Sequence, residues 1–137
     1  MLRVILVAEP PPEQSEAVAA ALESTPLTEV FAASGMLPSS NRIAGLHSLT
    51  ATRDERFDSG PTALEAILGV AESTEGTIAV VATSGVVREV LVHALDAPVP
   101  EDRLALDPGA IAEVEVRTDA PWTVNRINDA CHLGSLG

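Results

Sequence analysis

IAVVATSGVVREVLVHAL, the stretch from Ile78 to Leu95, contains the pattern that decides the fold. Its first residues, Ile78–Val81, form the short apolar run that is typical of a central strand in a parallel sheet. After Thr83-Ser84-Gly85, apolar residues recur at helical spacing as far as Leu95. The stretch predicts a buried strand, a sharp turn and a helix that opens at Val86. Because ligands of open α/β sheets bind at the carboxyl ends of strands, a site should border Thr83–Gly85.

Segments on the amino-terminal side have the same alternating strand and helix character. Leu2–Val7 is an apolar strand, and a helix is expected from about Glu13 to Glu23, where Thr25-Pro26 stops it. The remaining expected elements are a second strand at Thr28–Ala33, a short strand at Leu46–Ala51 and a helix from Pro61 to about Ser73. Strands that alternate with helices predict an α/β fold with a mostly parallel sheet.

The carboxyl-terminal part changes from this pattern to a hairpin. Ala110–Arg117 alternates apolar and charged residues, as a half-exposed strand does. Thr118-Asp119-Ala120-Pro121 is a turn, and Trp122–Ile127 is its expected partner strand. The sequence therefore predicts a single three-layer α/β domain over residues 1–137, with helices on both faces of the sheet and an antiparallel C-terminal edge hairpin.

Composition limits the classes of function. The chain has 137 residues, a net charge of -12 and eight basic residues, all arginine. A surface this acidic disfavours nucleic acid and anionic membranes as partners, although acidity alone mainly indicates solubility. Neither a membrane-spanning run nor a signal peptide is expected, and Cys131 alone forms no internal disulfide, so a bacterial cytoplasmic protein is expected. Aromatic residues are 2% of the chain, which predicts an aliphatic core.

Three segments carry a resemblance to a known family. MLRVILV at the start, Ala82–Arg88 (ATSGVVR) and the tail Ile127–Leu133 (INDACHL) occur in the order of matching segments of the histidine phosphatase (phosphoglycerate mutase-like) superfamily. That family has Arg-His-Gly after its first strand and Ser-His-Gly-Gly-Val-Ile-Arg at the later turn. The chain resembles this superfamily over its first strand and over nearly all of Thr77–Leu133, which implies the same fold. Residues 34–73 match poorly.

The resemblance also implies that the catalytic groups have been replaced. The two catalytic histidines of the family fall on Glu9 and Thr83, and its arginines on Ala8 and Leu37. Pro10 stands where the family has glycine. Pro38 disfavours a helix at Leu37, which leaves Arg42 as the nearest cation that could turn back to the site. The chain is thus expected to be a degenerate member.

The leading functional interpretation is non-catalytic. The chain would be a pseudophosphatase that binds a protein partner or a small ligand, or that acts as an oligomer subunit, without a cofactor or metal. The expected ligand-binding residues are Glu9, Thr83, Ser84, Gly85 and Arg42. Gly85 has two explanations, because it either keeps an anion-binding helix start or avoids a clash between helix and strand. One alternative is an enzyme that uses Glu9 as nucleophile or acid/base. Another is a purely structural subunit.

Other reactive side chains give weaker signals. Glu55 is the nearest match to a family acid that assists the leaving group, but the charged run Arg53–Arg56 is more simply a solvated loop. His47, His93 and His132 show no metal-ligand spacing. His93 is expected to be an exposed helix residue, and Cys131 a structural cysteine that is buried or lies at an edge.

Overall fold

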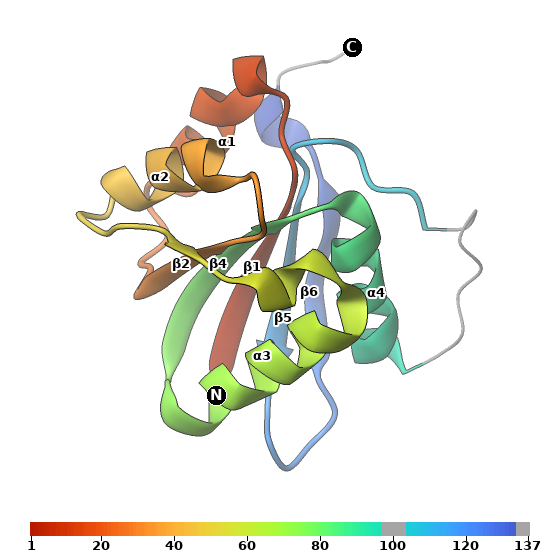
Figure 1. The fold of residues 1–137 in the computed structure, drawn as a ribbon. Helices are drawn as coiled ribbons and strands as arrows, with labels where there is room; N and C mark the ends of the chain where they lie inside the picture. Colours follow the sequence, from red (N-terminus) through yellow and green to blue (C-terminus); the bar gives the residue numbers. More distant parts are fainter. Residues whose placement is uncertain (97–103, 134–137) are drawn as a thin grey trace.

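A computed structural model describes residues 1–96 and 104–133, and this part of the chain forms one six-stranded sheet (Figure 1). In chain order the strands are β1 (Leu2–Ala8), β2 (Glu29–Ala32), β3 (Thr52–Arg53), β4 (Gly76–Ala82), β5 (Ile111–Val116) and β6 (Thr123–Asp129). The spatial order is β3-β2-β4-β1-β5-β6. β3, β2, β4 and β1 are parallel, whereas β5 and β6 form an antiparallel hairpin on one edge. The predicted fold class is therefore confirmed.

Helices cover both faces of the sheet. They are α1 (Ser15–Ala21), α2 (Leu37–Gly45), α3 (Gly60–Ser73) and α4 (Ser84–Leu95), with short 3-10 turns η1 (Pro12–Gln14), η2 (Glu55–Asp58) and η4 (Cys131–Leu133). The crossover from β1 to β2, through α1, and the crossover from β3 to β4, through α3, run in opposite directions across the sheet. Because crossovers between parallel strands are right-handed, α1 and α3 lie on opposite faces of the sheet. Figure 1 shows α1 beside α2 and α3 beside α4. No helix within the described ranges is long and apolar enough to cross a bilayer.

The core is aliphatic and centred on β1 and β4. Val4, Ile5 and Val7 of β1 are fully buried, as is the facing run Ile78–Ala82 of β4, apart from 1% exposure at Val80. The two phenylalanines, Phe31 and Phe57, lie together with ring centroids 5.6 Å apart. A strand with both faces buried reads as a continuous apolar run, which is why these two strands were identifiable from the sequence.

The prediction that Pro38 disfavours a helix at Leu37 is wrong. α2 begins at Leu37 and places Pro38 in its first turn. A proline is tolerated there because the N–H that it lacks would have had no partner within the helix. The buried hydroxyl of Ser40 also donates to the carbonyl oxygen of Met36 at 2.7 Å, and this hydrogen bond stabilises the first turn of α2.

Three other boundaries differ from expectation. The strand expected at Leu46–Ala51 is absent, because α2 continues to Gly45 and a tight turn with Ser48 in the left-handed region precedes β3. The helix expected from Glu13 starts later, since the prolines give a 3-10 turn before α1. α4 opens at Ser84 instead of Val86, because Thr83 caps it.

Two leucines of α4 test how the fold is stabilised. Leu91 is fully buried, whereas Leu95, one turn later, is 42% exposed. We expect Leu91→Ala to lower the free energy of unfolding by about 2–5 kcal/mol, because it removes packed methyl groups and leaves a cavity. Leu95→Ala, the matched control, should cost about 1 kcal/mol or less. Denaturant unfolding of both variants measures the difference, and equal losses would contradict the packing described for α4.

Candidate functional site

The pairing of β1 with β4 brings Glu9 and Thr83 together. Ala8 and Ala82 are partners at the ends of these parallel strands, and the backbone N–H of Glu9 donates to the carbonyl oxygen of Ala82 at 2.8 Å. Glu9 and Thr83 are the next residues of the two chains, so they lie on neighbouring strands about 5 Å apart at the carboxyl edge of the sheet. This edge is where open α/β sheets bind ligands.

Thr83 acts as the N-cap of α4. Its backbone is extended, at φ -65° and ψ 156°, and its hydroxyl oxygen accepts the backbone N–H of Val86 at 3.3 Å. Its carbonyl oxygen accepts the N–H of Val87 at 3.0 Å. Threonine is a favourable residue at this position because its side chain satisfies a helix N–H that has no partner within the helix. The sequence that fixes the start of α4 thus also fixes the position of Thr83 at the edge.

Ser84 and Gly85 border a shallow depression at the start of α4. It encloses about 280 Å³ and is lined by these two residues, by Arg88 and by Leu104–Leu106. A methyl group added at Gly85 would have its nearest neighbour, the Thr83 hydroxyl oxygen, at 3.9 Å, which is an ordinary contact. The explanation that Gly85 avoids a clash between helix and strand is therefore wrong. The structure also places a cation, Arg88, at an edge that was expected to have lost its positive charge.

Glu9 presents an exposed side chain at this edge, whereas Pro10 beside it is buried. Within residues 1–96 and 104–133 the Glu9 carboxylate makes no hydrogen bond or ion pair. A carboxylate that works as a nucleophile or general base is oriented by a neighbouring group. Nothing in the described part of the chain orients Glu9 in this way.

Leu37 is the first residue of α2, and Arg42 lies in the last turn of the same helix. Leu37 is half-buried and packs against the core. Nη1 of Arg42 donates to Oε1 of Glu16 on α1 at 2.9 Å, and both side chains line a groove between the two helices. The structure thus gives Arg42 a partner on α1 and does not turn it toward Thr83.

A polar cluster at the ends of β2 and β3 was not predicted from the sequence. The backbone N–H and the hydroxyl of Ser34 each donate to the carboxylate of Asp58 at 2.7 Å. Nη2 of Arg53 donates to the same hydroxyl oxygen at 3.2 Å. These hydrogen bonds, the one from the Ser34 hydroxyl above all, hold the pKa of Asp58 below its ordinary value. The sequence feature that could have indicated this cluster was the position of Ser34, which closely follows a strand of the parallel sheet.

The charged run at 53–56 is held by hydrogen bonds, although three of its four side chains are exposed and only Asp54 is half-buried. Asp54 caps η2 by accepting the backbone N–H of Arg56 at 3.0 Å, and its carboxylate also binds the Arg56 guanidinium. The Arg56 guanidinium lowers the pKa of Asp54, and the same pairing raises the pKa of Arg56. Glu55, the candidate acid, is exposed in this 3-10 turn. It forms no ion pair with another described residue.

Each histidine is engaged elsewhere. Nε2 of His47 donates to the carbonyl oxygen of Leu22 at 3.0 Å, and Nε2 of His132 donates to that of Gly109 at 2.8 Å. His93 is exposed, as expected, and its ring lies against Trp122. No group of residues that could bind a metal occurs in the described ranges. Cys131 was expected to be buried or to lie at an edge, and the structure excludes the first alternative, because the residue is exposed at the start of η4, after the edge strand β6.

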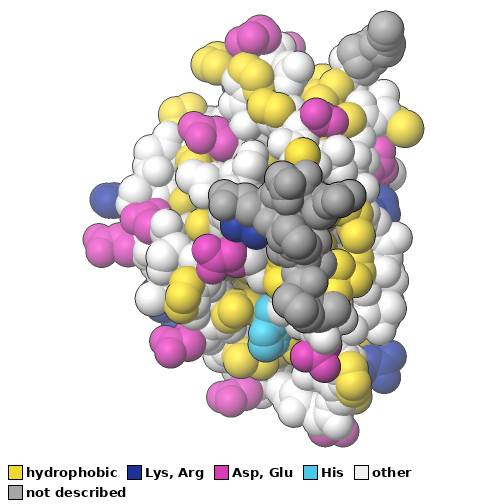
Figure 2. Space-filling model, turned by 90° about the vertical axis from the view of Figure 1, so that its right-hand side faces the viewer, with side chains coloured by type: hydrophobic (Ala, Val, Ile, Leu, Met, Phe, Trp, Pro, Cys, Tyr) yellow, Lys and Arg dark blue, Asp and Glu magenta, His cyan; other side chains and the backbone are white. Residues whose placement is uncertain are grey.

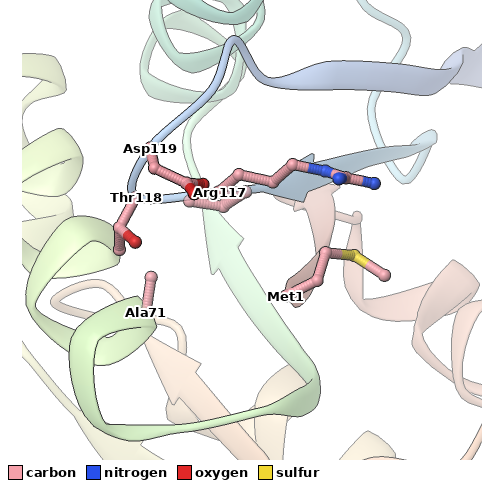
Figure 3. A pocket seen from close by; sticks show the side chains of 6 residues that line it. Met1, Ala71, Arg117, Thr118 and Asp119 are labelled. Atoms are coloured by element: carbon pink, nitrogen blue, oxygen red, sulfur yellow. The ribbon is translucent and has the colours of Figure 1, made fainter.

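A second depression lies at the opposite, amino-terminal edge of the parallel strands. It encloses about 160 Å³ and is lined by Met1, Ala71 and the residues Val116–Asp119. Figure 3 shows Thr118 facing Ala71, while the Arg117 side chain extends above Met1. Parallel α/β sheets do not usually bind ligands at this edge. The carboxyl edge is therefore the candidate site.

Comparison with known proteins establishes the fold. No family model matches the sequence and no curated protein is similar to it. Solved structures do match. Bacillus stearothermophilus YhfR superposes with a TM-score of 0.84 at 12% identity, over 97% of this chain and 100% of that one. Mycobacterial glucosyl-3-phosphoglycerate phosphatase gives 0.79 at 9% identity, over 93% and 98%. A mutant Entamoeba histolytica phosphoserine phosphatase in complex with phosphoserine gives 0.79 at 12%, over 97% and 100%. The chain has the histidine phosphatase (phosphoglycerate mutase-like) fold.

Two glycines in first turns of helices make a matched test of the site geometry. A side chain at Gly85 has room, so Gly85→Ala should leave the protein as stable or stabilise it by up to about 1 kcal/mol. A side chain at Gly60, the first residue of α3, would collide with Glu89 of α4, whose Cβ lies 2.8 Å from the added carbon. Gly60→Ala should therefore cost about 1–3 kcal/mol. Thermal unfolding compares the two, and a larger loss at Gly85 would contradict the geometry.

The hydrogen-bonded aspartates predict loss of stability in acid. Hydrogen bonds hold the pKa values of Asp54, Asp58 and Asp129 below the ordinary value of an aspartate, in the case of Asp129 chiefly through the backbone N–H of Cys131. Because each pKa is lower in the folded state, the stabilisation is present above about pH 4 and is lost as pH falls through the folded-state pKa. Unfolding measured from about pH 5 to pH 3 should show this loss, and Asp58→Asn should make it shallower.

The control for this measurement is Asp119→Asn. Asp119 is exposed and makes no hydrogen bond within the described residues. Its replacement should leave the pH dependence of stability unchanged. An equal effect of the two substitutions would show that the pairing of Asp58 with Ser34 does not persist in solution.

Proposed function

We propose that this chain is a catalytically inactive protein of the histidine phosphatase fold, which binds a small polar ligand at the carboxyl edge of its sheet. One observation carries the proposal. The register Ala8↔Ala82 sets Glu9 and Thr83 side by side, at the two positions to which the resemblance assigns the catalytic histidines. The fold has kept the arrangement of the family while the nucleophilic imidazoles have been replaced.

The chemistry of the replacements supports binding without turnover. A phosphohistidine mechanism needs an imidazole at the end of β1, and the described histidines are held at other places by Leu22, Trp122 and Gly109. Thr83 uses its hydroxyl as a cap for α4. No group in the described part of the edge is arranged to receive and pass on a phosphoryl group.

Electrostatics at Glu9 argue against a phosphate ligand. A phosphate oxygen held about 4 Å from the carboxylate would be repelled by about 4 kcal/mol per charge pair at an effective dielectric constant of about 20. Arg88 and Arg53 lie along the same edge, but neither is without a partner, since Arg53 is hydrogen-bonded to Ser34 beside Asp58 and Arg88 has an interaction of its own. A ligand that fits this edge is one with hydroxyl or amide groups and no dense negative charge.

Two other functions follow from specific observations. The exposed carboxylate of Glu9 at a strand end favours an enzyme of changed chemistry as the second candidate. Binding of a protein partner is the third candidate, because a depression of about 280 Å³ accommodates one side chain as readily as a small molecule. In that form the chain would act as a binding or structural subunit.

Replacing Glu9 by Gln separates these functions. We expect neither the wild type nor Glu9→Gln to hydrolyse an aryl phosphate above a buffer blank. We also expect inorganic phosphate to raise the melting temperature more in Glu9→Gln than in the wild type, since the substitution removes a repulsive charge. Melting is compared with sodium chloride at equal ionic strength. Glu13→Gln, a substitution at an exposed residue of η1, is the matched control and should behave as the wild type does.

The results have different meanings for the two candidates. Hydrolysis by the wild type that disappears in Glu9→Gln would overturn the inactive assignment and support an enzyme based on Glu9. A large stabilisation of the wild type by phosphate alone would show that the edge still accepts anions despite Glu9. No change between Glu9→Gln and Glu13→Gln would show that Glu9 does not face the ligand.

A further inference from the structure

A pocket of about 210 Å³ lies at the opposite end of α4 from the carboxyl edge. It is lined by His93, Ala94, Asp96, Ala120, Pro121 and Trp122. These residues come from the last turn of α4 and from the turn that leads into β6, which lie next to each other (Figure 1). Since α4 has 12 residues and rises about 1.5 Å per residue, about 18 Å separates this pocket from the carboxyl edge.

Two rings form walls of the pocket. The centroids of His93 and Trp122 are 4.8 Å apart, and their planes meet at 72°. Trp122 is half-buried, so its indole is held by packing against the core and still reaches solvent. An indole ring attracts cations to its face through its quadrupole, and it does so more strongly than the ring of tyrosine or phenylalanine.

The pocket also concentrates negative charge. Asp96 ends α4 in the left-handed conformation, at φ 51° and ψ 42°. The last carbonyl oxygens of a helix carry the negative end of its dipole, so a carboxylate at this position is unfavourable for the helix itself. Within residues 1–96 and 104–133 Asp96 has no cationic partner. Figure 2 shows the side of the molecule on which α4 lies, where carboxylates and apolar side chains are interspersed.

We propose that this pocket binds an organic cation, an ammonium or guanidinium group. Trp122 would contribute its ring face, while Asp96 and the carbonyl end of α4 would contribute negative charge. At about 30 Å³ per small group, the volume of about 210 Å³ accommodates about seven non-hydrogen atoms, the size of choline or of the end of a lysine or arginine side chain. The site goes beyond the proposed function, because it shares none of its residues with the carboxyl edge.

The fluorescence of Trp122 tests the proposal directly, because it is the only tryptophan of the chain and there is no tyrosine. We expect choline chloride to change the emission in a saturable way, compared with sodium chloride at equal ionic strength. Its neutral isostere 3,3-dimethylbutan-1-ol, which has the same shape without the charge, should give no saturable change. A saturable response to the alcohol equal to that to choline would overturn the proposal, since the pocket would then recognise shape only.

Asp96→Asn examines the carboxylate without disturbing the helix end, because asparagine also adopts the left-handed conformation readily. We expect it to weaken choline binding about tenfold, by calorimetry as well as by fluorescence. Glu72→Gln removes an exposed carboxylate from α3 and should leave binding unchanged. Unchanged affinity in Asp96→Asn, or equal losses in both variants, would overturn the assignment.

The source of the cation is decided by a second probe. Acetyl-Gly-Lys-Gly-amide presents the same charge on a peptide. Binding of this peptide that matches or exceeds that of choline, with the same dependence on Asp96, would identify a basic protein segment as the occupant. Binding of choline alone would identify a free small cation. A failure of both probes would overturn the proposal.

Discussion

The parallel pairing of β1 with β4 is the interaction on which the rest of the structure depends. Seven consecutive residues of each strand are in register, from Leu2↔Gly76 to Ala8↔Ala82, and the last five residues of each strand are buried. The backbone groups of buried strands must be hydrogen-bonded to each other, so this register cannot shift without loss of the core. It fixes the end of β1 and the end of β4 at one place on the sheet edge, whatever residues follow them.

That constraint supports the proposal of a fold that persists without the family's catalytic groups, because the register does not depend on the side chains at the sheet edge. The positions of Glu9 and Thr83 are set by the backbone ladder and by the cap of α4, which need no histidine. The side chains at these positions contribute little to the core, because both are exposed. Substitution of Glu9 should therefore cost little stability, whereas substitution of Thr83 removes the cap of α4 and replacement of a residue such as Ile78 would leave a cavity.

The buried elements of the fold could be predicted from the sequence, whereas the polar side chains at the sheet edge could be predicted only in part. β1, β4, α4 and the C-terminal hairpin were identifiable because their apolar periodicity is strong and their burial is complete or alternating. Residues 34–58 were not, because Pro38 is compatible with a helix start as well as with a break, and because β3 has two residues and no apolar pattern. The juxtaposition of Glu9 with Thr83 could be inferred from two strand ends. The bonding of Ser34 to Asp58 could not, since it depends on how β3 and η2 fold back toward β2.

The position of β1 in the middle of the sheet has a consequence for synthesis of the chain. β1 is made first, but its two neighbours are β4, which begins at Gly76, and β5, in which Val116 pairs with Leu2. A ribosome must therefore add more than a hundred residues before the second edge of β1 can be satisfied. During that interval an apolar strand with unpaired backbone groups is exposed, a state that is prone to aggregate and that makes folding slow. Shielding of the nascent β1 until the hairpin has emerged would protect the chain from this hazard.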